Sequence, residues 1–182
     1  IFAHHVAPDY PLVFAANRDE FHARPTAPSA FWDDHPGLLA GRDLEQGGTW
    51  MGITRSGRFA AVTNYRDPAR TAPAPRSRGE LTVGYLAGDT PPGDYLKQLA
   101  GRATEYAGFI LLLGDERSLW YYSNSGDLAP RELAPGIYGL SNARLDPPWP
   151  KVERGKARLR DIMDYSLAGL CHEPLGAVVA GR

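Results

Sequence analysis

A run of four polar and charged residues, Asn17-Arg18-Asp19-Glu20, comes directly after the apolar segment 12–16. The apolar segment has the composition of a β-strand, so the run begins where the core gives way to surface. A carboxylate beside an arginine stays ionised and can orient an amine or a general base. The alternative interpretation is a polar surface loop whose Asp-Arg pair contributes little to stability. We take the run as the first part of a candidate site.

Two asparagines occupy the same kind of position further along the chain. Asn64 follows the expected strand 59–63, and Asn142 follows the expected strand 137–141. Side-chain amides can donate hydrogen bonds to a developing oxyanion. An asparagine at a strand end is also a common turn residue. If the strands are neighbours, these amides and the Asn17 run form one convergent polar site.

Histidine and cysteine usage indicates neither a metal site nor a disulfide. The five histidines do not have a spacing typical of metal ligands: His4, His5, His22, His35 and His172. Adjacent strand residues face opposite sides, so only one of the first two histidines is expected to face a given site. Cys171 is the single cysteine, which excludes an intrachain disulfide and is typical of a reducing, cytoplasmic compartment. We interpret it as an incidental thiol.

Length and charge exclude several classes of protein. A chain of 182 residues with 43% hydrophobic residues suits a single domain with a real core. No apolar run approaches the roughly 20 residues that span a bilayer. The net charge of −1 provides no overall electrostatic footprint for nucleic acid or for an acidic membrane surface.

The elements that must position the candidate residues are strands in the first third of the chain and mixed elements afterwards. A capping-box spacing, Ser77 to Glu80, predicts a helix that runs to about Leu86. Apolar spacing predicts helices over 93–105 and 150–166, the second with Val152, Leu159, Ile162 and Met163 inward. Segments 21–37 and 66–76 are expected to be loops. Expected strands are 1–6, 12–16, 38–43, 49–54, 58–64, 108–113, 119–123 and 137–141.

This order of elements favours an α+β fold in segregated layers. A doubly wound sheet would alternate strands with helices and would carry a glycine-rich phosphate loop after its first strand. Gly47-Gly48 is too short to count as such a loop.

Several short motifs, taken in order, are similar to those of the NRDE family, also called the transport and Golgi organisation family. The resemblance covers about residues 1–160. It rests on Ala15 to Phe21 with Arg24-Pro25 and Trp32, and then on Gly41-Arg42-Asp43, Gly47-Gly48-Thr49-Trp50, Phe59 to Asn64, Ser77-Arg78-Gly79, Tyr138 to Asn142, and Trp149-Pro150-Lys151.

The resemblance implies a four-layer αββα sandwich of the N-terminal-nucleophile hydrolase type, with mainly antiparallel sheets. In the related bile-salt hydrolases and penicillin V acylases, an N-terminal Cys attacks an amide. Asp19 resembles the Asp that engages its amine, while Asn64 and Asn142 resemble two oxyanion-site asparagines. Ala16 stands where those hydrolases carry an Arg, and Arg18 could replace that Arg only by reaching from the other face of the strand.

The resemblance also implies sequence on either side of this domain. The family usually opens with Met-Cys just before the stretch that matches Ile1, and it tends to continue into a strand with a Tyr-Gly-Thr-Arg motif. We therefore expect residues 1–182 to be a single NRDE-type domain that lacks a few N-terminal residues and a C-terminal part.

Three functions follow as expectations from the resemblance. The first is handling of a small molecule, in haem trafficking or in acyl-lipid and coenzyme A metabolism, with haem as a possible ligand. Its ligand-binding residues are Asn17, Arg18, Glu20, Arg42 and Trp50. The second is a Cys-dependent amidohydrolase whose catalytic residues include Asp19, Asn64 and Asn142, although the nucleophile is absent from residues 1–182. The third is a non-catalytic protein-interaction domain. The sequence does not predict an oligomeric state.

Overall fold

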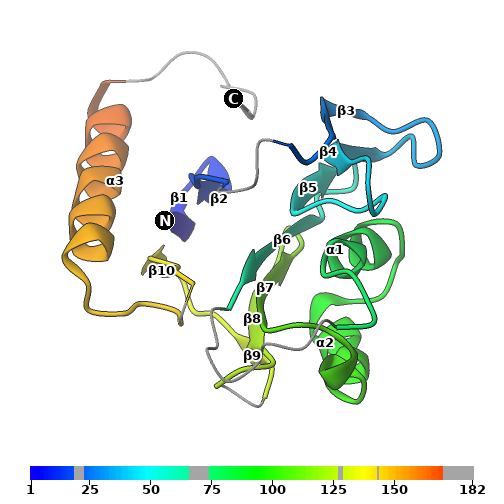
Figure 1. Cartoon of the computed structure of the whole chain (residues 1–182). Helices are drawn as coiled ribbons and strands as arrows, with labels where there is room; N and C mark the ends of the chain where they lie inside the picture. The colour runs from blue at the N-terminus through cyan, green and yellow to red at the C-terminus, as the bar shows by residue number, and fades with distance from the viewer. Residues whose placement is uncertain (19–22, 66–73, 127–128, 143, 170–182) are drawn as a thin grey trace. The chain divides into compact units, whose positions relative to one another are not determined.

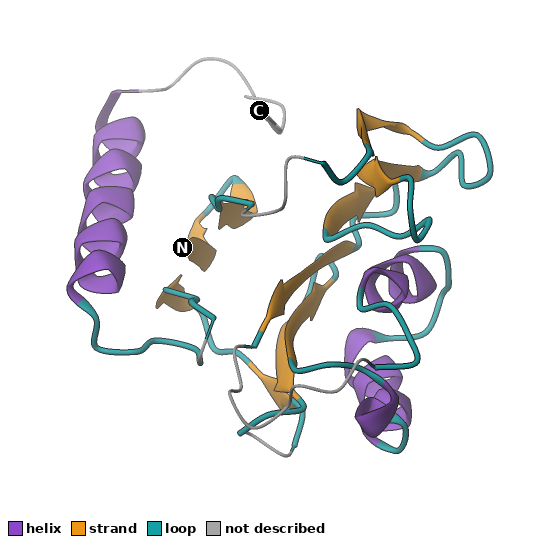
Figure 2. Ribbon diagram, in the orientation of Figure 1, coloured by secondary structure: helices purple, strands orange, loops and turns teal. Residues whose placement is uncertain are grey.

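The computed structural model describes residues 1–18, 23–65, 74–126, 129–142 and 144–169, with the backbone alone for 165–169. Two compact units divide the chain. We call Ile1–Arg18 with Ala134–Arg182 the terminal unit, and Asp19–Leu133 the central unit. Both combine helices with antiparallel sheets, which confirms the α+β class (Figures 1 and 2).

The terminal unit contains a three-stranded antiparallel sheet in the order β10-β1-β2. Its strands are β1 (Phe2–Ala7), β2 (Tyr10–Phe14) and β10 (Gly136–Tyr138). Helix α3 (Pro150–Gly169) packs on β1 and β10. The small core between helix and sheet consists of Ala3, Ala7, Leu159 and Met163, with half-buried Ile1, Val13 and Ile137 beside it.

One face of α3 carries the apolar stripe that the sequence predicts. Val152, Leu159 and Met163 are buried. Their spacing of seven and four residues returns to the same side of an α-helix. The prediction that Ile162 points inward is wrong, because this side chain is 61% exposed. A residue next to Met163 is turned by about 100° around the helix axis, which takes it off the stripe.

The two adjacent histidines of β1 have different environments. His4 is buried, whereas His5 is exposed and has a positive φ of 47°. The register of β1 with β2 shifts between His4 and Ala7, so the strand bulges at this point.

The central unit contains a seven-stranded sheet in the order β3-β4-β5-β6-β7-β8-β9, and all neighbouring strands are antiparallel. The strands are β3 (Thr26–Phe31), β4 (Leu38–Asp43), β5 (Met51–Thr54), β6 (Phe59–Asn64), β7 (Phe109–Gly114), β8 (Leu119–Ser123) and β9 (Arg131–Glu132). Gly57 turns the β5–β6 hairpin with a φ of 77°, as its position predicts.

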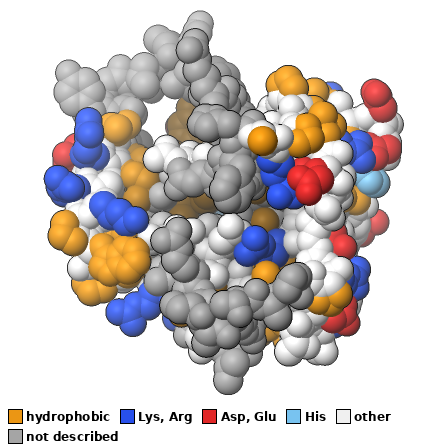
Figure 3. Space-filling model, in the orientation of Figure 1, with side chains coloured by type: hydrophobic (Ala, Val, Ile, Leu, Met, Phe, Trp, Pro, Cys, Tyr) orange, Lys and Arg blue, Asp and Glu red, His pale blue; other side chains and the backbone are white. Residues whose placement is uncertain are grey.

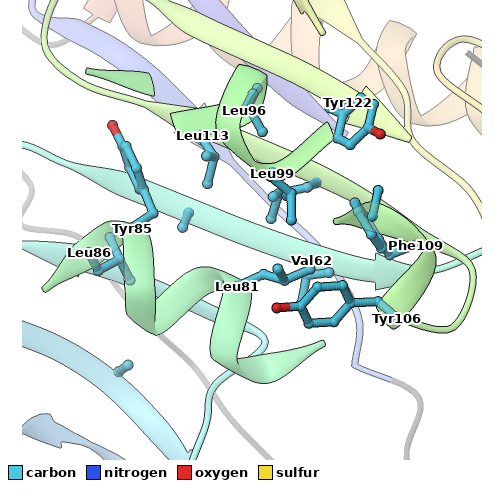
Figure 4. Close-up of a cluster of buried hydrophobic side chains, with 14 of the residues drawn as sticks. Val62, Leu81, Tyr85, Leu86, Leu96, Leu99, Tyr106, Phe109, Leu113 and Tyr122 are labelled. Carbon is cyan, nitrogen blue, oxygen red and sulfur yellow. The ribbon is translucent and has the colours of Figure 1, made fainter. Parts of the chain in front are cut away.

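Helices α1 (Gly79–Leu86) and α2 (Pro92–Ala100) cover one face of this sheet (Figures 1 and 2). Apolar side chains from both helices meet those of β6, β7 and β8 in the core that Figure 4 shows. Leu111 and Leu113 of β7 belong to this core, and the alternate residues Ile110 and Leu112 are also fully buried. Since alternate strand residues face opposite sides, β7 is apolar on both faces of the sheet.

Strand β3 lies within the segment 21–37, which was expected to be a loop. Among the strands that the structure describes, it pairs with β4 alone, and it is mostly exposed. An edge strand of this kind lacks the alternation of apolar and polar residues that identifies a half-buried strand. The expectation of a loop is therefore wrong for residues 26–31. The expected loop 66–76 lies mostly outside the described residues.

Helix α1 ends at Leu86 as expected, but the capping box does not form. Ser77 Oγ accepts a hydrogen bond from Gly79 N at 3.3 Å, and the first turn has no side-chain cap. Glu80 instead pairs with Arg76 Nε at 2.6 Å and accepts a hydrogen bond from the Tyr106 hydroxyl at 2.5 Å. Arg76, four residues earlier, and Tyr106, from a distant segment, therefore compete with the local cap for the same carboxylate. Helix α2 ends at Ala100, and a 3₁₀ turn covers Ala103–Glu105.

Candidate functional site

One edge of the three-stranded sheet brings two candidate segments together. Phe2 lies opposite both Phe14 and Tyr138 in the antiparallel ladders. Strands β2 and β10 therefore end where β1 begins, and segments 15–18 and 139–142 leave the sheet at that edge. Ile1 and Ala15 continue the ladder with two backbone hydrogen bonds of 2.9 Å.

Aromatic rings lie at the end of each strand at this edge. The ring of Phe2 stacks on those of Phe14 and Tyr138, with centroid distances of 6.0 and 5.3 Å. Phe2 is buried, and the two outer rings are half-buried. An apolar surface therefore adjoins the start of both polar segments.

Asn17 and Arg18 are exposed in the segment that follows β2. Ala15 and Ala16 are exposed as well, so the half-buried part of this segment ends at Phe14, earlier than predicted. Asp19 and Glu20 lie outside the described residues.

Asn142 is exposed on a short loop that two contacts close. Leu140 and Leu145 form an isolated antiparallel bridge around it. Below the bridge, Gly139 N donates to Asp146 Oδ1 and Asp146 N donates to Gly139 O, each at 2.7 Å. Asp146 has a positive φ of 50°, a conformation that aspartate tolerates better than most residues.

Helix α3 holds the same loop through Asp146. Lys156 Nζ donates to Asp146 Oδ1 at 3.1 Å, and the lysine side chain is only 17% exposed. Gly139 lies so close to Val152 of the helix that a Cβ atom at this position would overlap its side chain. We call these contacts of Asp146 with Gly139 and Lys156 the Asp146 clamp. The clamp limits the positions that Asn142 can adopt.

Asn64 lies in the central unit, at the exposed end of β6 and opposite Phe109. Its amide makes no hydrogen bond to any residue that the structure describes. This position confirms that Asn64 ends a strand, whereas its catalytic role stays a prediction.

Asn124 is a strand-end asparagine that the sequence analysis missed. Its Oδ1 accepts a hydrogen bond from Phe109 N at 2.8 Å, and its Nδ2 donates to Ala103 O at 2.9 Å and to Tyr106 O at 3.3 Å. The side chain is buried, so its amide serves backbone groups rather than a ligand. It directly follows β8, whereas Asn64 is the last residue of β6, and the same positional rule would have found it.

Arg42 has well-defined partners on the β3–β4 hairpin. Its guanidinium donates two hydrogen bonds to Asp34, at 2.9 and 2.7 Å, and lies 4.2 Å from the Trp32 ring centroid. The hydrogen bond from Arg42 lowers the pKa of the Asp34 carboxyl below its usual value. Trp50 is half-buried and packs against the helix-covered core. Ligand binding by Arg42 and Trp50 stays a prediction.

Two further motifs of the resemblance form a backbone contact in the central unit. They are Gly47-Gly48-Thr49-Trp50 and Ser77-Arg78-Gly79. A Cβ atom on Gly48 would lie 2.6 Å from the carbonyl carbon of Gly79. Thr49 N donates to Gly79 O at 3.3 Å, and Thr82 Oγ1 donates to the same oxygen at 2.8 Å. The glycines are therefore needed for packing of α1 on β5, which is a structural role.

The structure thus places Asn17, Arg18 and Asn142 at one edge of one sheet, whereas Arg42, Trp50 and Asn64 belong to the central unit. Among the described residues, no group of three or more His, Cys, Asp or Glu is placed to hold a metal ion. A search of the same residues finds no helix that combines the length and the apolar character needed to cross a membrane.

These features define a mixed α/β protein whose small sheet presents polar segments at one edge. Residues 1–176 match the family described as Transport and Golgi organisation 2. The chain belongs to this family, which confirms the resemblance that the sequence motifs indicated.

Curated relatives from animals show the same relationship. The chain is 41% identical over 173 residues to the Transport and Golgi organization protein 2 homolog of Bos taurus, covering 85% of this chain and 62% of the relative. Identity to the Homo sapiens homolog is 41% over 167 residues, covering 87% and 60%. Identity to Transport and Golgi organization protein 2 of Drosophila melanogaster is 29% over 169 residues, covering 85% and 59%. The chain therefore spans about three fifths of the length of these relatives.

Proposed function

We propose that this protein handles a small amphiphilic ligand at the edge where β2 and β10 end. The observation that carries the proposal is the register of Phe2 with Phe14 and Tyr138, which brings two polar segments to one edge. Arg18 offers a cation there, and Asn17 and Asn142 offer amides. Binding sites of this kind combine apolar surface with a few polar groups that orient the ligand.

The proposed ligand class is haem or an acyl-lipid such as acyl-coenzyme A. Both combine anionic groups with a large apolar body. Guanidinium and amide groups are suited to the anionic part, because charge-assisted hydrogen bonds to carboxylate or phosphate are the stronger ones. The half-buried rings of Phe14 and Tyr138 are suited to the apolar part.

Titration of the purified protein tests this proposal. Haem binding is followed by its Soret band and acyl-coenzyme A binding by calorimetry. Arg18→Ala should weaken binding about ten- to hundredfold, because a hydrogen bond to a charged group contributes roughly 1.5–3 kcal/mol. Arg160→Ala, which removes an exposed arginine of α3, is the matched control and should leave affinity unchanged. Equal affinity of the two variants, or no saturable binding by the parent protein, would contradict the proposal.

A second candidate function is amide hydrolysis, and the start of β1 favours it. A residue directly before Ile1 would emerge between the ends of β2 and β10, beside Asn17 and Asn142. The family resemblance implies a Cys at that position. Its thiolate would attack the amide carbon and release the amine, and water would then hydrolyse the thioester. Asp19 would engage the α-amino group of that Cys, and Asn64 and Asn142 would donate to the oxyanion.

Alkylation distinguishes the two candidates. In a Cys171→Ser background, the natural protein is treated with iodoacetamide and its intact mass is measured. The hydrolase requires one modified thiol at the N-terminal residue and loss of activity toward an amide substrate. Unchanged mass would exclude the hydrolase and would leave ligand handling untouched.

The proposal includes the four-layer αββα fold that the family resemblance implies. In support, each unit has a helix layer on a sheet layer, and β7 is apolar on both faces. A compact particle of this length has a radius of gyration of about 16 Å. Small-angle scattering that gave a much larger value would contradict this arrangement.

We also propose a cytoplasmic location. The support is the single cysteine, since disulfide-stabilised proteins belong mainly to oxidising compartments. Fractionation of cells that produce the tagged natural protein tests it, and recovery in a secretory or periplasmic fraction would contradict it.

A further inference from the structure

Helix α3 carries a stripe of exposed cations on its solvent side. Lys151, Arg154 and Arg158 are exposed, and their spacing of three and four residues aligns them along one side of the helix. Ile162 follows four residues after Arg158 and is 61% exposed. Figure 3 shows lysine and arginine side chains among hydrophobic ones over this helix.

An exposed tryptophan adjoins the beginning of the stripe. Trp149 comes directly before the helix and is 39% exposed. Lys151 Nζ lies 5.1 Å from the centroid of its ring, which places the indole beside the first cation. We call Trp149, Lys151, Arg154, Arg158 and Ile162 the basic stripe.

The cations of the stripe are not neutralised by the carboxylates of the helix. Glu153 lies on another side and approaches Lys156 at 3.8 Å. Asp161 is three residues from Arg158, but no described carboxylate forms an ion pair with any of the three cations of the stripe. The whole chain has a net charge of −1, so the positive charge is a local feature that the overall balance conceals.

We propose that the basic stripe binds peripherally to the anionic surface of a phospholipid membrane. Lysine and arginine are attracted to the negative potential of anionic lipids. Tryptophan favours the level of the headgroups, and an aliphatic side chain beside it enters the boundary of the acyl region. The exposed Trp149 and Ile162 favour a membrane over nucleic acid, whose phosphates would leave both side chains in water. The proposal does not depend on a ligand at the sheet edge.

Vesicle co-sedimentation tests this proposal with phosphatidylcholine alone and with added phosphatidylserine. The protein should bind only the vesicles that contain phosphatidylserine, and less at high salt. The variant K151Q/R154Q/R158Q should bind about a hundredfold more weakly, since each cation near such a surface contributes about fivefold. Glutamine keeps the helix propensity of the replaced residues. The matched control K97Q/R102Q/R117Q removes the same charge from exposed positions of the central unit and should bind like the parent protein.

A second variant keeps the test decisive if the triple variant loses its helix by circular dichroism. Trp149→Phe lies outside α3, and it should remove most of the blue shift in tryptophan emission that vesicles cause in the parent protein. Equal binding by the parent protein and the triple variant, equal binding to both kinds of vesicle, or a blue shift that persists in Trp149→Phe would overturn the proposal.

Discussion

Asn124 of the central unit and the two asparagines that follow the strands of the terminal unit have opposite environments. In the central unit, Asn124 is buried, and backbone groups occupy both its oxygen and its nitrogen. In the terminal unit, Asn17 and Asn142 remain exposed, and it is the Asp146 clamp that orders the backbone next to Asn142. The packing around an asparagine at a strand end therefore decides its role. It either stabilises the backbone or stays available to a ligand.

The cores of the two units differ in the size of the side chains that they bury. The central unit buries leucine, tyrosine and phenylalanine side chains beneath α1 and α2 (Figure 4). The terminal unit buries two alanines, a leucine and a methionine beneath α3. Apolar burial is the main source of stability, so changes in the central core should have the largest effects.

Leu111→Ala is expected to have the largest effect of the changes considered. Leu111 is fully buried in the central core, and its loss leaves a cavity, so the free energy of unfolding should fall by about 2–5 kcal/mol. Ile162→Ala removes an exposed side chain and should change it by less than about 0.5 kcal/mol. Urea denaturation measures both. A similar loss for the two variants would show that the apolar core of the central unit does not dominate stability.

Asn124→Ala should destabilise the protein by about 1–3 kcal/mol, because it leaves the buried Phe109 N–H and the carbonyl of Ala103 without their partner. Asn64→Ala changes the same residue type at an exposed strand end and should cost less than about 0.5 kcal/mol. Thermal or urea unfolding compares them. Equal costs would refute the distinction between structural and available asparagines.

The raised pKa of Tyr85 predicts a loss of stability at alkaline pH. Its buried hydroxyl donates to Gly114 O at 2.9 Å, and burial raises its pKa from 10.0 to about 12. The contribution is therefore complete below the unfolded-state pKa of 10.0 and is lost as the pH rises toward about 12. At about pH 11 the loss should be on the order of 1–2 kcal/mol, and Tyr85→Phe should remove this part of the pH dependence. If the free energy of unfolding of Tyr85→Phe fell with rising pH as steeply as that of the parent protein, another group would be responsible for the loss.

Asp146→Ala should lower the free energy of unfolding by about 1 kcal/mol, because the loop it closes is partly exposed. Asp146→Asn retains an acceptor for Gly139 N and tolerates the positive φ, so it should recover most of that loss. Affinity for the proposed ligand should fall in the alanine variant and return in the asparagine variant. Loss of affinity without recovery would indicate that the carboxylate itself contacts the ligand.

Much of the secondary structure could be predicted because it depends on local pattern. The apolar run of β7, the glycine turn before β6 and the end of α1 at Leu86 each have a short-range signal. Strand β3 could not be predicted, since an edge strand has one partner and little burial. The contact of Glu80 with Tyr106 could not be predicted either, because these residues lie 26 positions apart and meet only in the folded chain.

The candidate site could likewise be predicted only in part. Residue type and position identified Asn17, Arg18 and Asn142 as polar groups that follow apolar strands, and they also identified the family. The register of β1 with β2 and β10 decided that these residues share one edge of a sheet, because the pairing of β1 with β10 joins segments far apart in the chain. Burial decided that Asn124 is structural and that Lys151, Arg154 and Arg158 are exposed on one side of α3. Such distinctions require three-dimensional neighbours, which the order of residues along the chain does not contain.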